Sequence, residues 1–77
     1  MLKELVEYIA KALVDNPDAV IVESSEDEKT TMPRLKVAQT DLGRVIGKQG
    51  RTARAMRTLL HATAAKSRRR AVLEIVE

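Results

Sequence analysis

The residues best suited to chemistry are the seven from Val45 to Arg51, which read Val-Ile-Gly-Lys-Gln-Gly-Arg. Two glycines three positions apart, between two helical segments, predict a tight turn whose backbone can approach a ligand closely. The second glycine leads into a helix start, where free N–H groups and the positive end of the helix dipole favour an anion. Lys48 and Arg51 add positive charge at the same place. A phosphodiester is the ligand that these features suit.

The spacing of this loop differs from two common phosphate-binding motifs. A P-loop needs four residues between its glycines, followed by lysine and serine or threonine, and the dinucleotide fingerprint also has a different spacing. The bare pattern of two glycines three apart is common, and an ordinary connection between helices would also produce it. The surrounding elements must therefore decide between these interpretations.

No other part of the sequence indicates an enzyme. His61, the only histidine, falls on the polar face of a helical segment, without a neighbouring nucleophile or second ligand. The acidic residues between Ser24 and Lys29 fit a solvated connection better than a metal site. The chain has no cysteine, which removes thiolate catalysis, disulfides and zinc-finger ligation. We therefore expect no catalytic residue, no metal and no cofactor.

The charge of the chain is divided unevenly along its length. Residues 1–43 carry 5 Lys and Arg against 9 Asp and Glu, whereas residues 44–77 carry 9 against 2. Basic charge confined to one half favours a positive face and a polyanionic partner, although folding could instead disperse it. No apolar run approaches the ~20 residues that span a bilayer, and the amino terminus is unlike a signal peptide. A cytoplasmic protein without a membrane segment is the expectation.

The first forty residues predict one helix and two strands. An amphipathic helix ends at Asn16-Pro17, because proline disfavours helical geometry in the residue before it. The β-branched run 19–22 predicts a strand, the polar segment 24–29 a connection, and residues 34–39 a second strand with Pro33 near its start. The apolar residues at helical spacing are Leu2, Leu5, Val6, Ile9 and Leu13.

Three further elements complete the predicted fold. A short helix over 42–46, capped by Thr40 or Asp41, ends at Gly47. A two-faced helix runs from about Arg51 to Lys66, and the run 71–76 predicts a last strand. The order α-β-β-α-α-β predicts an α+β fold with an antiparallel, three-stranded sheet and helices on one face, forming a single domain over 1–77. The apolar face of the long helix is expected to hold Ala53, Met56, Leu59, Leu60 and Thr63.

In this context the loop Gly47-Lys48-Gln49-Gly50 resembles the Gly-x-x-Gly loop of KH domains, and the element order resembles the type II KH fold. The resemblance covers nearly the whole chain and is closest to the KhpA-type family of small bacterial proteins made of one KH domain. It implies single-stranded RNA binding, with the loop clamping the backbone of about four nucleotides. It also matches Val45 and Ile46 to the apolar pair that packs the preceding helix. Ala53 departs from the large aliphatic residue of many KH domains, which predicts a shallower groove.

The resulting hypothesis is a basic strip that holds the RNA backbone beside a groove for the bases. The groove is expected between the last two helices and the second strand. Aromatic stacking cannot dominate, because Tyr8 is the only aromatic residue. The cluster Arg68–Arg70 is either a second phosphate-binding patch or a basic helix end that complements the dipole. The residues expected to contact RNA are Val45, Ile46, Gly47, Lys48, Gln49, Gly50, Arg51 and Arg54, with Arg34 and Lys36 from the second strand.

The resemblance also implies partners and a cellular role. It suggests an RNA chaperone or post-transcriptional regulator that forms homodimers. It further suggests a larger partner that joins a KH domain to a second nucleic-acid-binding domain of the Arg-xxx-His type. Two alternatives stay open: a protein-interaction or dimerisation module within an RNA-binding complex, and single-stranded DNA binding, because recognition of the 2′-OH is not visible in a motif.

Overall fold

The computed structural model describes residues 2–77, and its elements follow the predicted order. The α-helices are α1 (Leu2–Leu13), α2 (Leu42–Ile46) and α3 (Arg51–Lys66). Single 3-10 turns lie at Pro17–Ala19, Gln39–Asp41 and Lys48–Gly50. The strands are β1 (Ile21–Glu26), β2 (Thr30–Lys36), β3 (Arg70–Ala71) and β4 (Glu74–Ile75). The predicted α+β class is confirmed.

The hairpin of β1 and β2 is longer than predicted. β1 starts at Ile21 because Ala19 closes the turn that Pro17 begins, and it continues through the polar residues 24–26 that were expected in the connection. The two strands pair antiparallel, from Ile21 opposite Lys36 to Glu26 opposite Thr31. Only residues 27–29 remain to connect them, and the prediction of a long solvated connection was wrong.

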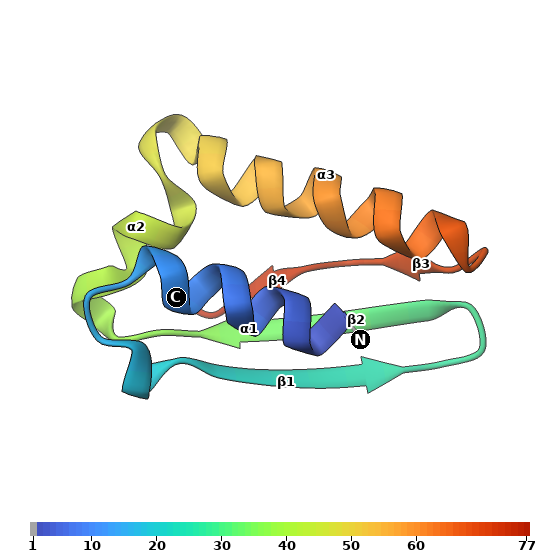
Figure 1. The fold of residues 1–77 in the computed structure, drawn as a ribbon, viewed down its shortest axis with the longest axis horizontal. Coiled ribbons are helices and arrows are strands. Elements are labelled where there is room, and N and C mark those ends of the chain that lie inside the picture. The colour runs from blue at the N-terminus through green and yellow to red at the C-terminus, as the bar shows by residue number, and fades with distance from the viewer. Residues whose placement is uncertain (1) are drawn as a thin grey trace.

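The sheet is mixed, so the prediction of an antiparallel sheet was wrong. β2 lies in the middle, with β1 on one side, while β3 and β4 both pair parallel to it on the other. A parallel pair needs a long crossover between its strands, and here α2 and α3 together supply it (Figure 1). We call β3, β4 and the residues between them the C-terminal row.

Pro33 explains why the C-terminal row is split into two strands. It was expected near the start of its strand but lies in the middle of β2, with its side chain fully buried. The carbonyls of Thr31 and Leu35 accept from Val72 and Val76 at 3.0 and 2.9 Å, so the backbone of alternate β2 residues faces the C-terminal row. The backbone of Pro33 also faces the C-terminal row, but proline has no N–H to donate to it. The ladder is therefore interrupted between β3 and β4.

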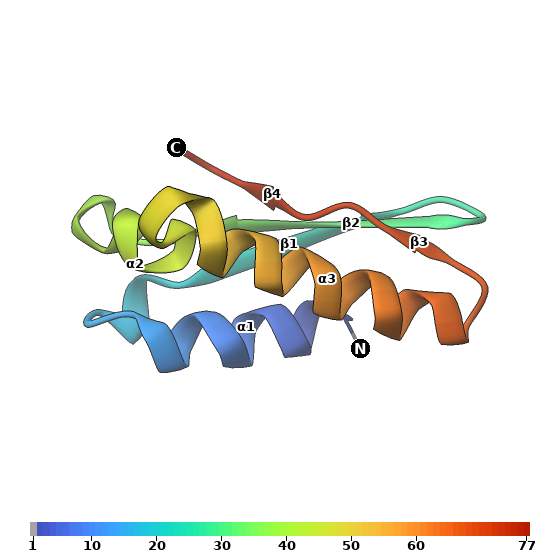
Figure 2. The same ribbon diagram turned by 90° about the horizontal axis from the view of Figure 1, so that it is seen from above.

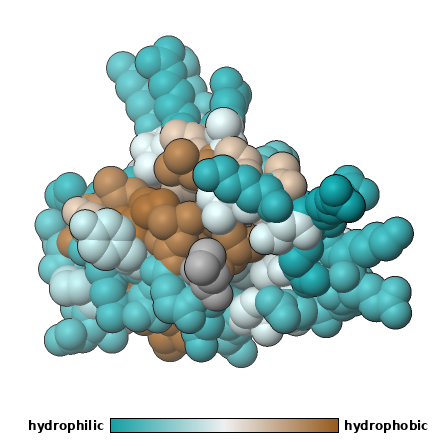
Figure 3. Space-filling view, turned by 45° about the vertical axis from the view of Figure 1, so that its right-hand side comes forward, coloured by the Kyte–Doolittle hydropathy of each residue, from teal (hydrophilic) through white to brown (hydrophobic). Residues whose placement is uncertain are grey.

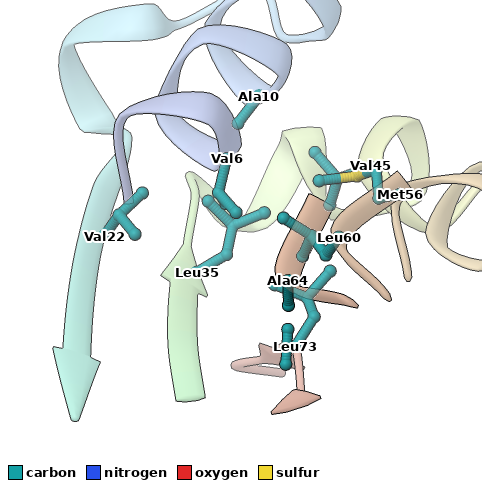
Figure 4. Packing of buried hydrophobic residues seen from close by; sticks show 10 residues of the cluster. Val6, Ala10, Val22, Leu35, Val45, Met56, Leu60, Ala64 and Leu73 are labelled. Carbon is teal, nitrogen blue, oxygen red and sulfur yellow. The ribbon is translucent and has the colours of Figure 1, made fainter. Parts of the chain in front are cut away.

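Both long helices cover the same face of the sheet, as predicted. Figure 2 shows α1 and α3 on one side, with α3 crossing obliquely so that its N-terminal end lies nearest the level of the sheet. The core between these layers is aliphatic: Val6 of α1 points toward Leu35 of β2, and Leu60 of α3 lies beside them (Figure 4). Burying such side chains stabilises the fold by about 1.5–3 kcal/mol each.

One residue of the predicted apolar face of α3 lies outside the core. Ala53, Met56 and Leu60 are buried, but the side chain of Leu59 is 53% exposed. The core face of the helix is narrower than the sequence pattern suggested, because its buried residues are Ala53, Met56, Leu60 and Ala64. Leu59 is thus available for other contacts.

Candidate nucleic-acid interface

Gly47 ends α2 in a conformation that a side chain could not share. Its φ and ψ are 77° and 169°, and its N–H donates to the Gly43 carbonyl at 2.8 Å. A Cβ atom at this position would meet three atoms of Thr52, with Oγ1 2.2 Å, Cβ 2.7 Å and the backbone nitrogen 2.8 Å away. Glycine is required here by both backbone conformation and space.

The other glycine of the loop is required for conformation only. Gly50 has a left-handed φ of 74°, and a Cβ there would meet no atom of the described residues within 4 Å. Gln49 is also left-handed, at φ 57° and ψ 27°, which is uncommon for a residue with a side chain. Lys48 and Gln49 are both exposed. The loop therefore presents its backbone and two polar side chains outward, in a strained turn.

Asp41 fixes the start of α2 by a contact that the sequence did not reveal. It occupies the predicted cap position, yet its buried carboxylate accepts from the backbone N–H groups of Asp15 and Asn16 at 3.2 and 3.0 Å. Arg44 reaches the Asp15 carboxylate at 3.1 Å. The prediction that Thr40 or Asp41 caps this helix was wrong, because the carboxylate instead ties α2 to the end of α1.

The two residues just before the loop, which the sequence assigned to packing, anchor the loop to the core. Val45 is fully buried in the core and Ile46 is half-buried against it. α3 begins at Arg51 directly after the loop, and no side chain of the described residues caps its first turn. Its uncapped N–H groups and dipole are thus directed toward the exposed turn.

Basic side chains continue from the loop along one flank of α3. Arg51 and Arg54 are exposed, as the hypothesis requires, and so is Arg57, which the sequence analysis did not select. Spacings of three and four residues place Arg54, Arg57 and His61 on the same flank of the helix. The signal for Arg57 was its position three residues after Arg54. These three residues define what we call the basic flank.

Arg34 and Lys36 do not lie with these residues. In β2 they alternate with the buried Leu35, so they point to the face of the sheet that the helices leave uncovered. Arg34 lies between Glu23 and Glu74 across the sheet, and its Nε is 3.7 Å from the Glu74 carboxylate. The strand in contact with α3 is β3, while β2 lies one row further away (Figure 1). The expected groove beside the second strand is therefore displaced to the C-terminal row.

Arg69 supports a structural interpretation of the basic cluster after α3. Its guanidinium donates to the carbonyls of Asp27, Glu28 and Thr30 at 3.0, 3.1 and 3.3 Å. It also donates to the Thr31 hydroxyl at 3.1 and 3.3 Å. These bonds join the end of α3 to the β1–β2 turn, whereas Arg68 and Arg70 stay exposed. Arg69 is therefore held by the β1–β2 turn and not by the end of the helix, and phosphate binding by Arg68 and Arg70 stays a prediction.

The β1–β2 turn carries a carboxylate with a shifted pKa. Bonds from the backbone N–H groups of Lys29 and Thr30, at 3.0 and 2.8 Å, hold the pKa of Asp27 below its ordinary value of 3.8. The charge of Arg69 acts in the same direction. Asp27, which the sequence assigned to a solvated connection, thus organises the turn.

No group of three or more histidine, cysteine or acidic side chains within residues 2–77 is arranged to hold a metal ion. None of the described helices is long and apolar enough to cross a membrane.

The family profile described as KhpA/KhpB, KH domain, matches residues 3–75 of this chain. The RNA-binding protein KhpA of Caldanaerobacter subterraneus is 55% identical over 73 residues, covering 95% of this chain and 97% of the relative. The proteins of the same name from Aquifex aeolicus and Borreliella burgdorferi are 55% and 53% identical, covering 99% and 96% of this chain and 96% and 90% of theirs. No solved structure matched. The chain belongs to the KhpA/KhpB KH domain family, and its fold is KH-like.

Proposed function

We propose that this chain is a single KH domain that binds single-stranded RNA by gripping the sugar–phosphate backbone at residues 47–50. The observation that carries the proposal is the exposed turn itself, with a glycine that tolerates no side chain and polar groups facing outward. The relatives named RNA-binding protein KhpA support the choice of RNA as ligand. Sequence-tolerant gripping suits an RNA chaperone or post-transcriptional regulator of the cytoplasm, and not an enzyme.

The grip has three parts. Backbone N–H groups at the start of α3 meet a phosphate, and the helix dipole favours its charge. Lys48 supplies a mobile ammonium, and Gln49 can donate to a phosphate or a 2′-OH. Arg51 and Arg54 hold the next phosphates along the strand. If about three or four phosphates are neutralised, log K falls with log salt at a slope of roughly −2 to −3.

The test is charge reversal on the exposed loop. Lys48→Asp with Gln49→Asp places two carboxylates where phosphate should bind, and the pair Lys11→Asp with Ala12→Asp makes the same change in charge on exposed positions of α1. Labelled single-stranded RNA is titrated against the parent and both variants, with circular dichroism as the check on folding. We expect the loop variant to stay folded and lose binding, while the α1 variant keeps most of it.

Equal binding by the parent and the loop variant would refute the grip. A matched DNA oligomer tests the remaining alternative in the same titration. Equal affinity for DNA would indicate a general binder of single strands and would remove the 2′-OH from the mechanism.

A separate observation favours self-association as a second property. Leu59 is 53% exposed and lines a hollow on α3 together with Ala55 and Thr58 and with the basic residues Arg51 and Arg54. Leu2, Leu5 and Ile9 of α1 are only half-buried, and Figure 3 shows an apolar area on this side of the molecule. We propose that this apolar area is covered by a second copy of the chain or by the KH domain of a larger family member. Leu59→Asp should shift the mass measured by light scattering from dimer to monomer, and an unchanged mass would refute this.

A further inference from the structure

The position of the loop depends on α2, a helix too short to hold its own place. α2 contains five residues, Leu42–Ile46, and the loop starts directly after it at Gly47. Helices of this length are marginal in water and depend on tertiary contacts for their stability. α3 starts at Arg51, so only residues 47–50 separate the two helices. A displacement of α2 relative to α3 must therefore be absorbed by the loop itself.

The loop has little freedom to absorb such a displacement. Gly47, Gln49 and Gly50 all have positive φ, a conformation that few residues with a side chain adopt. Gly47 also lies so close to Thr52 of α3 that a Cβ atom would collide with it. Moving α2 thus changes the direction of the peptide groups that are proposed to meet the phosphates.

Two contacts of different character hold α2 in place. Val45 is fully buried in the aliphatic core, and such an apolar contact has no preferred direction. Asp41, directly before α2, instead accepts hydrogen bonds, which are directional. Its Oδ1 accepts from the N–H of Asp15 at 3.2 Å, and its Oδ2 accepts from the N–H of Asn16 at 3.0 Å. The core therefore fixes how deeply α2 lies, while the Asp41 carboxylate fixes its orientation relative to the end of α1.

Burial makes the bonds of Asp41 hard to replace. The residue is 2% exposed, and a buried carboxylate that loses its partners is costly. Arg44 strengthens the same junction, because its Nε lies 3.9 Å from the Asp41 carboxylate and its Nη2 lies 3.1 Å from that of Asp15. Asp41 precedes Gly47 by six residues, about 9 Å along a helix. Shielded from solvent at this distance, Asp41 can influence RNA only through the position of the loop.

We propose that Asp41 is a positioning residue for RNA binding: its bonds to Asp15 and Asn16 set the place and orientation in which the loop 47–50 is presented. This inference rests on the proposed function, and it names a residue outside the RNA contact surface on which that function depends. A loop that holds the binding arrangement for only about one-tenth of the time binds about tenfold more weakly, although each of its own residues is intact.

The test variant is Asp41→Asn, which keeps the shape of the side chain but replaces one acceptor oxygen by an NH2 group facing an N–H donor. The control is Asp27→Asn. Asp27 also accepts from two backbone N–H groups, at 3.0 and 2.8 Å, and also interacts with an arginine, Arg69. It belongs to the β1–β2 turn, at the opposite end of the molecule from the loop (Figure 1). Each variant loses one negative charge, so the net charge of the protein changes equally in both.

Labelled single-stranded RNA is titrated by fluorescence anisotropy at a temperature where circular dichroism shows each variant to be folded. We expect Asp41→Asn to bind about tenfold more weakly than the parent, and Asp27→Asn to stay within about twofold of it. Loss of a negative charge by itself favours binding to a polyanion, so weaker binding has the sign of a displaced loop and not of altered charge. Equal binding by the parent and folded Asp41→Asn, or equal weakening by both variants, would overturn the inference.

Hydrogen exchange in the parent gives a readout that does not require Asp41→Asn to fold. If the bonds of Asp41 favour RNA binding, then RNA must by linkage stabilise those bonds. The amides of Asp15 and Asn16 should exchange more slowly when RNA is bound, by a larger factor than the amides of Lys29 and Thr30 in the β1–β2 turn. An equal factor for both pairs of amides would contradict the inference. A parent that binds no RNA would instead overturn the proposed function, so the two failures are distinguishable.

Discussion

The two loop glycines should differ sharply in their tolerance of alanine. At Gly47, φ 77° and ψ 169° fall in a region that is essentially restricted to glycine, and occupying it with a side chain costs about 1–3 kcal/mol. The added Cβ would also lie 2.7 Å from the Cβ of Thr52 and 2.8 Å from its backbone nitrogen, so the start of α3 must move. Gly47→Ala should therefore lower the free energy of unfolding by about 3 kcal/mol or more.

At Gly50 only the conformation is costly. A left-handed residue with a Cβ costs roughly 1–2 kcal/mol, and replacing glycine recovers about 0.4–1 kcal/mol by restricting the unfolded chain. Since a Cβ at Gly50 would meet no described atom within 4 Å, Gly50→Ala should cost only about 1 kcal/mol. Gly50→Asn should cost less, because asparagine tolerates this conformation.

Urea denaturation followed by circular dichroism measures these free energies, and RNA anisotropy reports whether the loop keeps its shape. A rescue test adds Thr52→Ala to Gly47→Ala. That change removes the Oγ1 contact of 2.2 Å but leaves the other two, so stability should recover by less than half. The reasoning would be refuted if Gly47→Ala kept both the stability and the RNA affinity of the parent, or if Gly50→Ala were the more damaging substitution.

Three further outcomes are expected. Arg69→Ala should lower the free energy of unfolding by about 2 kcal/mol in urea titrations, because several carbonyls of the β1–β2 turn lose a charged donor, and a loss below about 0.5 kcal/mol would contradict this. The depressed pKa of Asp27 stabilises the fold above its unfolded value of 3.8, and this contribution is lost as the pH falls through the lower folded value. Asp27→Asn should therefore be less stable than the parent at pH 6 and approach it toward pH 2, and a constant difference would refute the linkage. Arg54→Ala should reduce the magnitude of the salt slope of RNA binding by about 1, whereas Arg34→Ala, which is flanked by two glutamates, should leave the slope unchanged.

The sequence predicted best where structure is set by neighbouring residues. The end of α2 and the start of α3 followed from Gly47 and Gly50, because glycine permits particular backbone angles locally. The first helix was expected to end at Asn16-Pro17, but it already ends at Leu13. The charged loop and the exposure of Arg51 and Arg54 followed from the same local pattern.

Features that depend on distant contacts were missed. The Asp41 carboxylate bonds to the backbone 25 and 26 residues away, and Arg69 bonds to groups 38 to 42 residues away. In the sequence these residues look like a helix cap and part of a basic tail. Leu59 was misassigned because helical spacing marks an apolar stripe without showing how wide the covering element is.

The errors in strand direction and in groove position share one physical origin. Alternation along a strand shows which residues face the core, but it carries no information on direction. Because the C-terminal row runs parallel to β2, the chain must cross over through α2 and α3 before it pairs. The crossover lays α3 along the row that it leads into, so β3 and not β2 becomes the strand beside the basic flank. A parallel last strand thus places β3, and not Arg34 and Lys36 of β2, beside the basic flank.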